Sequence, residues 1–467
     1  MAHVLIVGAY GSAGVAVADD LVDAPEVDRL TLVDDGEPGG GLCILRGCMP
    51  SKELLSTAAH RYQARHDHRM LGTPEVDLEA TVATKDEHVA NFAAHRRGAV
   101  EMFAEEPHVE FLHDTARFVD DRTVAVGDRT LDPDYVVVAT GSTVTVPDLP
   151  GLEDVPFDTS RDVLDATAFP DSGVVMGFGT VGLELVPYLS EVGGVDLTVI
   201  EHDARPLDRA DPAFGDEILS LYREEFGVEI RTHTYEQSVE RTGDGGVRLH
   251  VEHEGVPDTV EADRLYLFTG RRPNLDRLGL DRTALAPEPG WVRQTMQARD
   301  DPRVYVVGDV TGRDAILHVA KEEGFTAAEN LRRQIRGEDL RTYEPTDHYV
   351  VFAGASVYPY ARVGHSAASA DAAGLETITA TRRAEEDGVF KTKAAAEGLA
   401  SLVVDRTDGT VLGYQGLHYH ADVMAKTMQV IVEAGTDVRD LPDRAYHPTT
   451  PEILDGLFRD AAEAVGR

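Results

Sequence analysis

The run VVMGFGTVG, residues 174 to 182, decides the fold class of this 467-residue chain. Its apolar start predicts a short buried strand, and its glycines, Gly177, Gly179 and Gly182, have the GxGxxG spacing that opens the helix of a dinucleotide-binding βαβ unit. The next predicted strand ends in Glu201, whose carboxylate can accept hydrogen bonds from a ribose. A glycine turn in an ordinary α/β sheet is the alternative, which this full context disfavours. We predict a dinucleotide site in which Glu201 favours NAD over NADP, because it would repel a 2′-phosphate.

A second unit of the same kind begins the chain. Residues 3 to 7 and 30 to 34 predict two strands, and the turn after the first contains Gly8, Gly11 and Gly14. This loop is irregular, since it fits GxGxxG only if Ala9 takes the place of the first glycine. Asp34 is the candidate ribose ligand, and two such units imply two dinucleotides. The apolar N-terminus also imitates a secretory signal, but no Lys or Arg precedes it, so we expect a cytoplasmic protein.

Length and charge limit the function classes. A chain of this length predicts three or four domains, and it contains no unbroken apolar run of the ~18 residues that a membrane helix needs. Asp and Glu number 83 against 44 Lys and Arg, and the net charge of −39 would repel nucleic acid and anionic membranes. The acidic residues are spread along the chain, which is typical of a hydrated surface in high salt. A merely acidic protein of ordinary salt is the alternative.

The chain has two cysteines, both in the segment GGGLCILRGCMPSK at residues 39 to 52. In a long cytoplasmic chain such a pair is more often catalytic or metal-binding than structural. Two thiols cannot complete a tetrahedral zinc site and no histidine cluster lies nearby in sequence, so we predict no metal and a redox use. A bond between Cys43 and Cys48 needs a distorted turn, because residues five apart in a regular helix face different sides, and Gly47 and Pro50 suit that distortion.

This segment resembles the redox motif GGxCxxxGCxPSK of the pyridine nucleotide-disulfide oxidoreductases. The resemblance covers nearly the whole chain, because further motifs of the family follow in order: Ala139 to Gly141, Gly270 to Asn274, Gly308-Asp309, and His447 to Glu452. It implies an α/β fold with two Rossmann-like dinucleotide-binding domains plus a C-terminal α+β interface domain. The implied divisions are 1–147 (FAD, first part), 148–267 (NAD), 268–342 (FAD, second part) and 343–467 (interface and dimerisation).

The resemblance also implies a role for each motif residue. Cys43 is the thiol that exchanges with substrate, and Cys48 is the thiol that faces the flavin. Lys52 and Glu184 form an ion pair near the flavin, while His447 and Glu452 form an acid-base dyad that reaches the disulfide from the other subunit of a homodimer. The predicted FAD residues are Gly8, Gly11, Gly14, Asp34, Gly41, Lys52, Thr140, Gly141, Gly308 and Asp309. The predicted NAD residues are Gly177, Gly179, Gly182, Glu201 and Gly270.

Within the family, the dihydrolipoamide dehydrogenases are the branch that this chain most resembles. Mercuric reductases and the larger thioredoxin reductases rely on a further C-terminal cysteine or selenocysteine, and this chain has none. Soluble transhydrogenases typically lack the first motif cysteine, and glutathione-type reductases usually place basic residues where Glu201 stands. The segment around His318 is also similar to the dihydrolipoamide dehydrogenase version. The resemblance therefore predicts oxidation of dihydrolipoamide, free or on a lipoyl domain, by NAD⁺ through FAD.

Departures from the family pattern keep two alternatives open. Leu42 replaces the usual Thr, residues 44–46 differ, and Ala445 stands where many lipoamide enzymes have a second histidine. The first alternative is an NAD(P)H-dependent reductase of a low-molecular-weight disulfide, similar to glutathione reductase or bis-γ-glutamylcystine reductase. The second is a non-catalytic flavoprotein redox sensor, which would not need Cys43, Cys48, His447 and Glu452 together.

Overall fold

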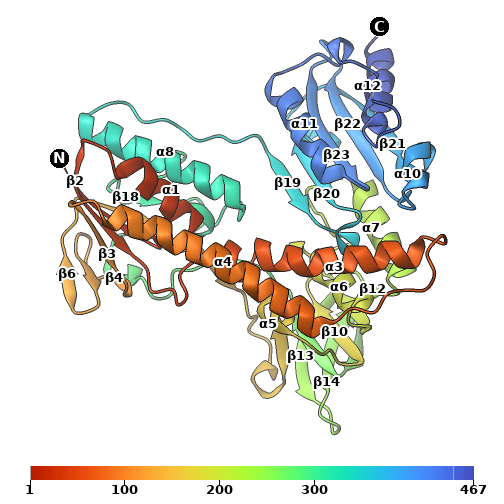
Figure 1. The fold of residues 1–467 in the computed structure, drawn as a ribbon, viewed down its shortest axis with the longest axis horizontal. Helices are drawn as coiled ribbons and strands as arrows, with labels where there is room; N and C mark the ends of the chain where they lie inside the picture. Colours follow the sequence, from red (N-terminus) through yellow and green to blue (C-terminus); the bar gives the residue numbers. More distant parts are fainter. Residues whose placement is uncertain (1, 445, 467) are drawn as a thin grey trace. The chain divides into compact units, whose positions relative to one another are not determined.

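The computed structural model describes residues 2–444 and 446–466, so Ala445 lies outside the described residues. The fold is mixed α/β and divides into two compact units, each assembled from separate parts of the chain (Figure 1). The first unit comprises Met1–Ser51, Ala83–Thr145 and Arg271–Pro345. The second comprises Lys52–Val82, Val146–Gly270 and Thr346–Arg467. The finer division into four domains stays a prediction.

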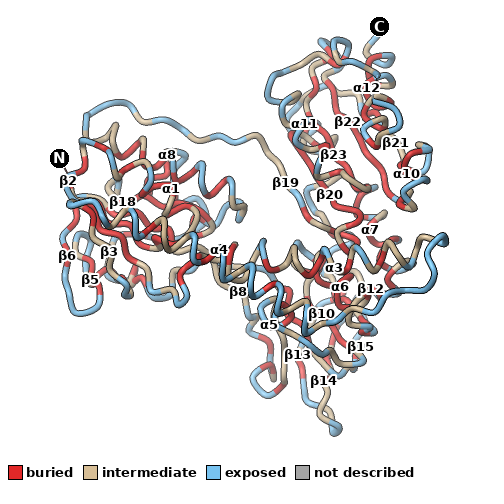
Figure 2. The backbone as a smooth tube through the Cα atoms, viewed as in Figure 1, coloured by how far each residue is buried: buried red, intermediate tan, exposed pale blue. Residues whose placement is uncertain are grey.

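A parallel sheet in the order β18-β7-β1-β2-β3 forms the core of the first unit. Alternate residues of β1 face opposite layers: Val4 and Ile6 pack with α1 and α8, while Leu5 and Val7 pack with the antiparallel sheet β4-β5-β6. Both faces are therefore covered, and Figure 2 shows that most residues of the strands β1, β7 and β18 are buried. The bounds are β1 Ala2–Val7, α1 Ser12–Leu21, β2 Val27–Val33, β3 Val109–Leu112, β4 Ala116–Phe118, β5 Val124–Val126, β6 Arg129–Leu131, β7 Tyr135–Val138, β18 Val304–Val306 and α8 Leu317–Arg336.

A second parallel sheet, in the order β12-β11-β10-β16-β9, forms the first part of the second unit. Val175 of its central strand packs toward α6 and α7, and Val174 and Met176 pack toward the antiparallel sheet β13-β14-β15. The bounds are β9 Phe157–Thr159, α5 Ser160–Asp165, β10 Ser172–Met176, α6 Thr180–Glu191, β11 Asp196–Ile200, α7 Pro212–Glu225, β12 Glu229–Arg231, β13 Thr234–Arg241, β14 Val247–His253, β15 Val256–Ala262 and β16 Arg264–Leu267.

The C-terminal part of the second unit is an antiparallel sheet in the order β19-β20-β23-β22-β21. Helices α11 and α12 cover one face, where Met424, Met428 and Leu457 are buried. This antiparallel sheet beside the two parallel ones confirms the predicted fold class. The bounds are β19 His348–Val351, β20 Tyr360–Gly364, α9 Ala367–Ala372, β21 Thr377–Arg383, α10 Gly388–Thr392, β22 Leu399–Asp405, β23 Val411–Leu417, α11 Ala421–Glu433 and α12 Glu452–Val465.

The redox segment folds as two successive helices, α2 (Leu42–Leu45) and α3 (Cys48–His66), and the long helix α4 (Leu78–Ala104) follows. A small antiparallel pair, β8 (Ser142–Val144) with β17 (Arg271–Pro273), joins distant parts of the first unit. In the part of the chain that the structure describes, no helix combines the length and the hydropathy that a membrane span requires.

Candidate redox and cofactor sites

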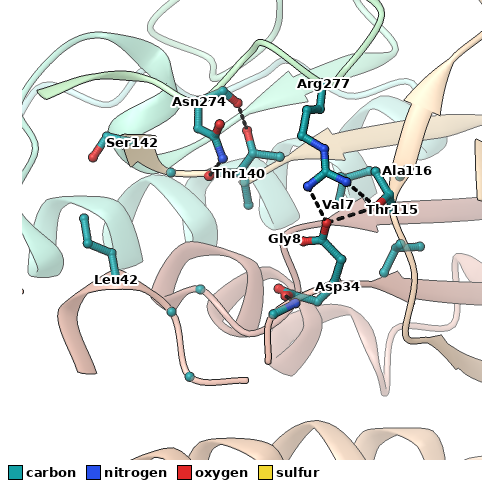
Figure 3. Close-up of a pocket in the computed structure, with 18 of the residues that line it drawn as sticks. Val7, Gly8, Asp34, Leu42, Thr115, Ala116, Thr140, Ser142, Asn274 and Arg277 are labelled. Atoms are coloured by element: carbon teal, nitrogen blue, oxygen red, sulfur yellow. Dashed lines mark hydrogen bonds and ion pairs between the residues drawn. The ribbon is translucent and has the colours of Figure 1, made fainter. Parts of the chain in front are cut away.

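The first unit contains a cavity of about 310 Å³ at the carboxyl ends of its parallel strands. This edge is where parallel α/β sheets bind their ligands. Figure 3 shows the cavity with Gly8, Asp34 and Thr140 around it. Six of the predicted FAD residues line it: Gly8, Gly11, Asp34, Gly41, Thr140 and Gly141. The cavity therefore has the place and the lining expected of a dinucleotide site.

Close backbone approaches explain why glycines stand in the first loop. Gly8 has φ +96°, and a Cβ on it would lie 2.3 Å from the carbonyl oxygen of Ala139. A Cβ on Gly14 would lie 2.2 Å from the carbonyl oxygen of Gly8, so α1 could not rest on the turn. The loop thus makes the turn of a dinucleotide site despite its irregular spacing, and the N-terminal N–H groups of α1 favour a pyrophosphate there.

Asp34 lies directly after β2 and orders two loops of the cavity. Its Oδ2 accepts a hydrogen bond from the backbone N–H of Tyr10 at 2.9 Å, and its Oδ1 accepts one from Gly36 at 2.8 Å. Burial raises the pKa of Asp34, while these two hydrogen bonds act in the opposite direction. Each carboxylate oxygen has a second lone pair, so a ribose hydroxyl can still donate to it.

A polar cluster that the sequence motifs did not reveal lines the same cavity. Arg277 Nη1 lies 3.0 Å from Asp35 Oδ2, and Arg277 Nη2 donates to Thr115 Oγ1 at 2.8 Å. Thr115 Oγ1 in turn donates to Asp35 Oδ2 at 3.0 Å. Arg277 stands outside every motif, so the sequence carries no signal for it. Thr140 lines the same cavity outside this cluster, and its Oγ1 donates to the carbonyl oxygen of Asn274 at 2.9 Å (Figure 3).

Asp309 connects to the cavity through a serine. Ser142 lines the cavity, and its Oγ donates to Asp309 Oδ2 at 2.6 Å. The preceding residue, Gly308, has φ +78° and donates its N–H to Glu323 Oε2 at 2.7 Å. Glu323 is buried, and burial raises its pKa to about 7. Ser142 directly follows the Ala139 to Gly141 motif, which is the signal that could have identified it.

The two cysteines lie on either side of the break between α2 and α3. Both are thiols, Cys43 half-buried in α2 and Cys48 exposed at the start of α3. A hydrogen bond with the Cys48 side chain and burial raise the pKa of Cys43. Gly47 lets the backbone between the two helices lie close to Cys43, because a Cβ on Gly47 would be only 3.2 Å from the Cα of Cys43. The helix is therefore interrupted between the two cysteines, as predicted, and disulfide formation stays a prediction.

The three glycines of the second loop have three different surroundings. Gly177 has φ +97°, and a Cβ on it would lie 2.6 Å from the carbonyl oxygen of Phe268. A Cβ on Gly182 would lie 2.5 Å from the carbonyl oxygen of Gly177. A Cβ on Gly179, in contrast, would meet no atom of the described residues within 4 Å. The first and third glycines therefore serve packing, and the second leaves room for a pyrophosphate beside the N-terminus of α6.

Glu201 and Gly270 follow the strands on either side of this loop. Glu201 comes directly after β11, and its Oε1 accepts a hydrogen bond from the backbone N–H of Asp203 at 2.9 Å. Burial raises the pKa of Glu201, and the Asp203 hydrogen bond opposes that effect. Gly270 follows β16 with φ +86°. The placement at the carboxyl ends of β11 and β16, the two strands that flank β10, is the one expected for ribose and nicotinamide contacts.

The predicted pair Lys52 and Glu184 meets within the second unit. Lys52 Nζ, on α3, lies 2.7 and 2.8 Å from the two carboxylate oxygens of Glu184 on α6. Lys52 Nζ also lies 4.3 Å from the ring centroid of Phe352, whose N–H donates to Glu184 Oε1 at 3.2 Å. Residues 132 positions apart are thus brought into a bidentate, partly buried ion pair.

His447 and Glu452 also meet, at the start of α12. His447 Nδ1 lies 2.9 Å from Glu452 Oε1, which also accepts the N–H of Thr449 at 3.0 Å. The hydrogen bond with His447 lowers the pKa of Glu452. The imidazole side chain is 77% exposed. A carboxylate on Nδ1 orients the ring and leaves Nε2 free of that contact, which is the arrangement that a histidine general base requires.

Known proteins are similar to this chain over most of its length. A mercuric reductase from Shigella flexneri is 30% identical over 97% of this chain and 79% of its own length. Dihydrolipoyl dehydrogenase 2 from Haloarcula marismortui is 30% identical over 89% of this chain and 88% of its own. The structure of the HOCl-induced flavoprotein disulfide reductase RclA from Escherichia coli superposes with a TM-score of 0.83 at 22% identity, covering 98% of this chain and 99% of that one.

Family models cover most of the chain. Residues 2–324 match the pyridine nucleotide-disulphide oxidoreductase model, and residues 352–457 match the dimerisation domain of the same family. The relatives and the sequence motifs indicate the same family as these models. The chain therefore belongs to the pyridine nucleotide-disulphide oxidoreductases, flavoproteins that act on a disulfide with FAD and a pyridine nucleotide.

Proposed function

We propose that this protein is a dihydrolipoamide dehydrogenase that uses FAD and NAD⁺. The observation that carries the proposal is the placement of Cys43 and Cys48, the two cysteines of the whole sequence, on either side of the break between α2 and α3. The mercuric reductases rely on a further C-terminal cysteine, and the sequence contains no cysteine besides Cys43 and Cys48. Glu201, at the end of β11, supports NAD because its carboxylate accepts ribose hydroxyls and repels a 2′-phosphate.

The residues of the chain would carry the thiol exchange as follows. His447 Nε2 accepts a proton from dihydrolipoamide, and the resulting thiolate attacks Sγ of Cys43 in the Cys43–Cys48 disulfide. That disulfide bond breaks, and Cys48 leaves as a thiolate with the electron pair. The second substrate thiol then attacks the substrate sulfur of the mixed disulfide and passes its proton to the departing sulfur of Cys43, so lipoamide is released while His447 keeps the first proton. FAD, when bound, supplies the two-electron route from the reduced cysteine pair to NAD⁺.

We also propose a homodimer with shared active sites, in which His447 serves the cysteine pair of the second copy. The matched dimerisation domain supports this, as do Val423 and Val430, which are 65% and 58% exposed on α11. Co-expressing a Cys48→Ser chain with a His447→Gln chain tests it. A shared site predicts that mixed dimers recover one intact site while each homodimer stays inactive; no recovery in mixed dimers would contradict it.

A substrate panel in high salt tests the proposed activity. The protein is assayed with NADH and NADPH against lipoamide, cystine-type disulfides and glutathione disulfide, and with NAD⁺ against dihydrolipoamide. We expect NADH with lipoamide to give the highest kcat/KM. Higher kcat/KM with a small cystine-type disulfide would favour the reductase alternative, which the departures at Leu42 and residues 44–46 support. A protein that binds flavin and turns over none of these substrates would favour the redox-sensor alternative.

A further inference from the structure

The turn between His447 and Glu452 is closed by its own hydrogen bonds. The N–H of Thr449 donates to Glu452 Oε1 at 3.0 Å, and the N–H of Glu452 donates to the carbonyl oxygen of Thr449 at 3.2 Å. His447 Nδ1 lies 2.9 Å from the same Oε1, so the dyad is part of this turn. Although the His447 side chain is exposed, Thr450 in the middle of the turn is buried. Thr450 is therefore the side on which the rest of the fold can hold the turn.

A histidine from another element contacts this buried side of the turn. His420 directly precedes α11, and its Nδ1 lies 3.1 Å from Thr450 Oγ1, which is 30 positions further along the chain. A threonine hydroxyl can donate or accept, so it can form a hydrogen bond with Nδ1 in either neutral tautomer of the ring. The imidazole also stacks on the ring of Tyr419, with centroids 3.9 Å apart. His420 thus presents a restrained nitrogen to the turn that contains the dyad, although it stands outside every motif.

The backbone of His420 has a conformation that is unfavourable for a histidine. It has φ +71° and ψ +18°, the left-handed region that glycine adopts at little cost and other residues rarely adopt. Among the described residues, its side chain makes no cap hydrogen bond to α11, so the imidazole does not stabilise the start of that helix. The His420 carbonyl oxygen accepts the N–H of Met424 at 3.1 Å, a bond that needs no particular side chain. A costly backbone conformation at a residue whose side chain contacts a site indicates a role in that site.

We propose that His420 is a positioning residue, which holds the turn from His447 to Glu452 through its contact with Thr450. The inference rests on the proposed function in taking His447 as the general base of thiol exchange. A base acts only where its nitrogen meets the substrate thiol, and misplacing a catalytic group by about 1 Å can cost about 10²-fold in rate. Thiol exchange therefore depends on support of this turn, whereas electron transfer from NADH to an artificial dye does not use His447.

Four variants of the holoenzyme test the contact from both sides. His420→Gly removes the imidazole and suits the left-handed backbone, while His420→Asn keeps a polar atom bonded to Cγ, as Nδ1 is, and also tolerates that backbone. Thr450→Val removes the hydroxyl with little change of shape. Thr449→Val is the matched control, because Thr449 Oγ1 is buried in the same turn and has no hydrogen-bond partner among the described residues. Flavin content and thermal unfolding check that each variant folds.

In His420→Gly and in Thr450→Val, kcat/KM for dihydrolipoamide should fall by about 10- to 100-fold, while NADH-to-dye electron transfer stays close to that of the parent. His420→Asn should retain most of the activity. The double variant of His420→Gly with Thr450→Val should lose no more than either single variant, because both remove one contact. Combining His420→Gly with Thr449→Val should instead multiply the two single effects. Equal loss of both reactions, or multiplied effects of His420→Gly and Thr450→Val, would overturn the proposal.

Hydrogen exchange in the peptide that contains residues 447–452 gives a readout that is independent of the substrate. Loss of the contact should speed exchange there in His420→Gly and in Thr450→Val, and His420→Asn should stay close to the parent. If the parent does not oxidise dihydrolipoamide, the proposed function fails, but this comparison still decides whether His420 holds the turn. Two variants remove the contact, so misfolding of one still leaves a result. Unchanged exchange in a folded variant would overturn the inference whatever the substrate is.

Discussion

At the scale of single residues, the predicted catalytic side chains occur as pairs that lie close together in the fold. Glu452 contacts Nδ1 of His447, and both carboxylate oxygens of Glu184 accept hydrogen bonds from Lys52 Nζ. The Cys48 side chain raises the pKa of Cys43. Each of these pairs lies within one unit, so its geometry follows from the local fold. The roles proposed for them make separable predictions.

Replacing His447 with Gln should slow exchange with dihydrolipoamide by about 10² to 10⁴, the range typical of losing a general base. Electron transfer from NADH to an artificial dye should change little, because it bypasses the thiol step. Steady-state assays of both reactions on the same preparation check this. Equal loss in both would show that His447 supports the structure and does not handle protons.

The raised pKa of Glu323 predicts that the free energy of unfolding depends on pH. Its pKa is about 7 in the folded protein against an ordinary 4.5, so the folded state keeps the proton and loses stability as pH rises from about 4.5 to about 7. Glu323→Gln is neutral throughout this range. Its gain in free energy of unfolding over the parent should therefore grow by on the order of 2 kcal/mol between pH 5 and pH 8. Urea unfolding at both values measures this, and an equal gain at pH 5 and pH 8 would contradict the effect of burial on Glu323.

At the scale of elements, the three glycines of the loop after β10 have different roles. Gly177 and Gly182 allow close packing of the backbone, whereas Gly179 leaves open space beside α6. The sequence motif identified all three positions but could not say which of them touches protein. That information lies in the backbone of Phe268, directly after β16, which approaches Gly177 from a distant part of the chain. The same limit explains why Arg277 was missed, since it reaches Asp35 and Thr115 only through the fold.

Alanine substitutions in this loop should separate the two roles. Gly177→Ala places a side chain at φ +97° and 2.6 Å from Phe268 oxygen, so we expect clear thermal destabilisation, with a backbone cost of at least about 1 kcal/mol. Gly179→Ala has room and φ −77°, so the melting temperature should stay near that of the parent while the KM for NADH rises. A normal KM in Gly179→Ala would contradict the assignment of that space to the pyrophosphate.

At the scale of the whole molecule, the sequence predicted the fold class and the family, because two glycine loops and one redox segment are specific and occur in order. It also predicted which residues form pairs, such as Lys52 with Glu184 across 132 positions. It could not predict the two compact units, whose segments alternate along the chain, or the proton affinity of a buried carboxyl such as Glu323. Those properties depend on burial, which a motif does not encode.

The net charge of −39 predicts that salt stabilises the protein. Raising ionic strength from 0.1 to 1 M shortens the Debye length from about 10 to about 3 Å and screens the self-repulsion of the folded state. The melting temperature should therefore rise with KCl. An osmotically matched sorbitol series separates screening from solute exclusion, and a melting temperature that stays flat or falls in KCl would count against salt adaptation.

The central claim is that Cys43 and Cys48 exchange electrons with a bound flavin, and anaerobic titration of the purified protein with NADH tests it most directly. We predict a yellow protein in which two electrons produce a long-wavelength absorbance band from the Cys48 thiolate beside the flavin, and the loss of that band in Cys48→Ser. A colourless protein, or a reduced flavin spectrum without the band in the parent, would contradict it.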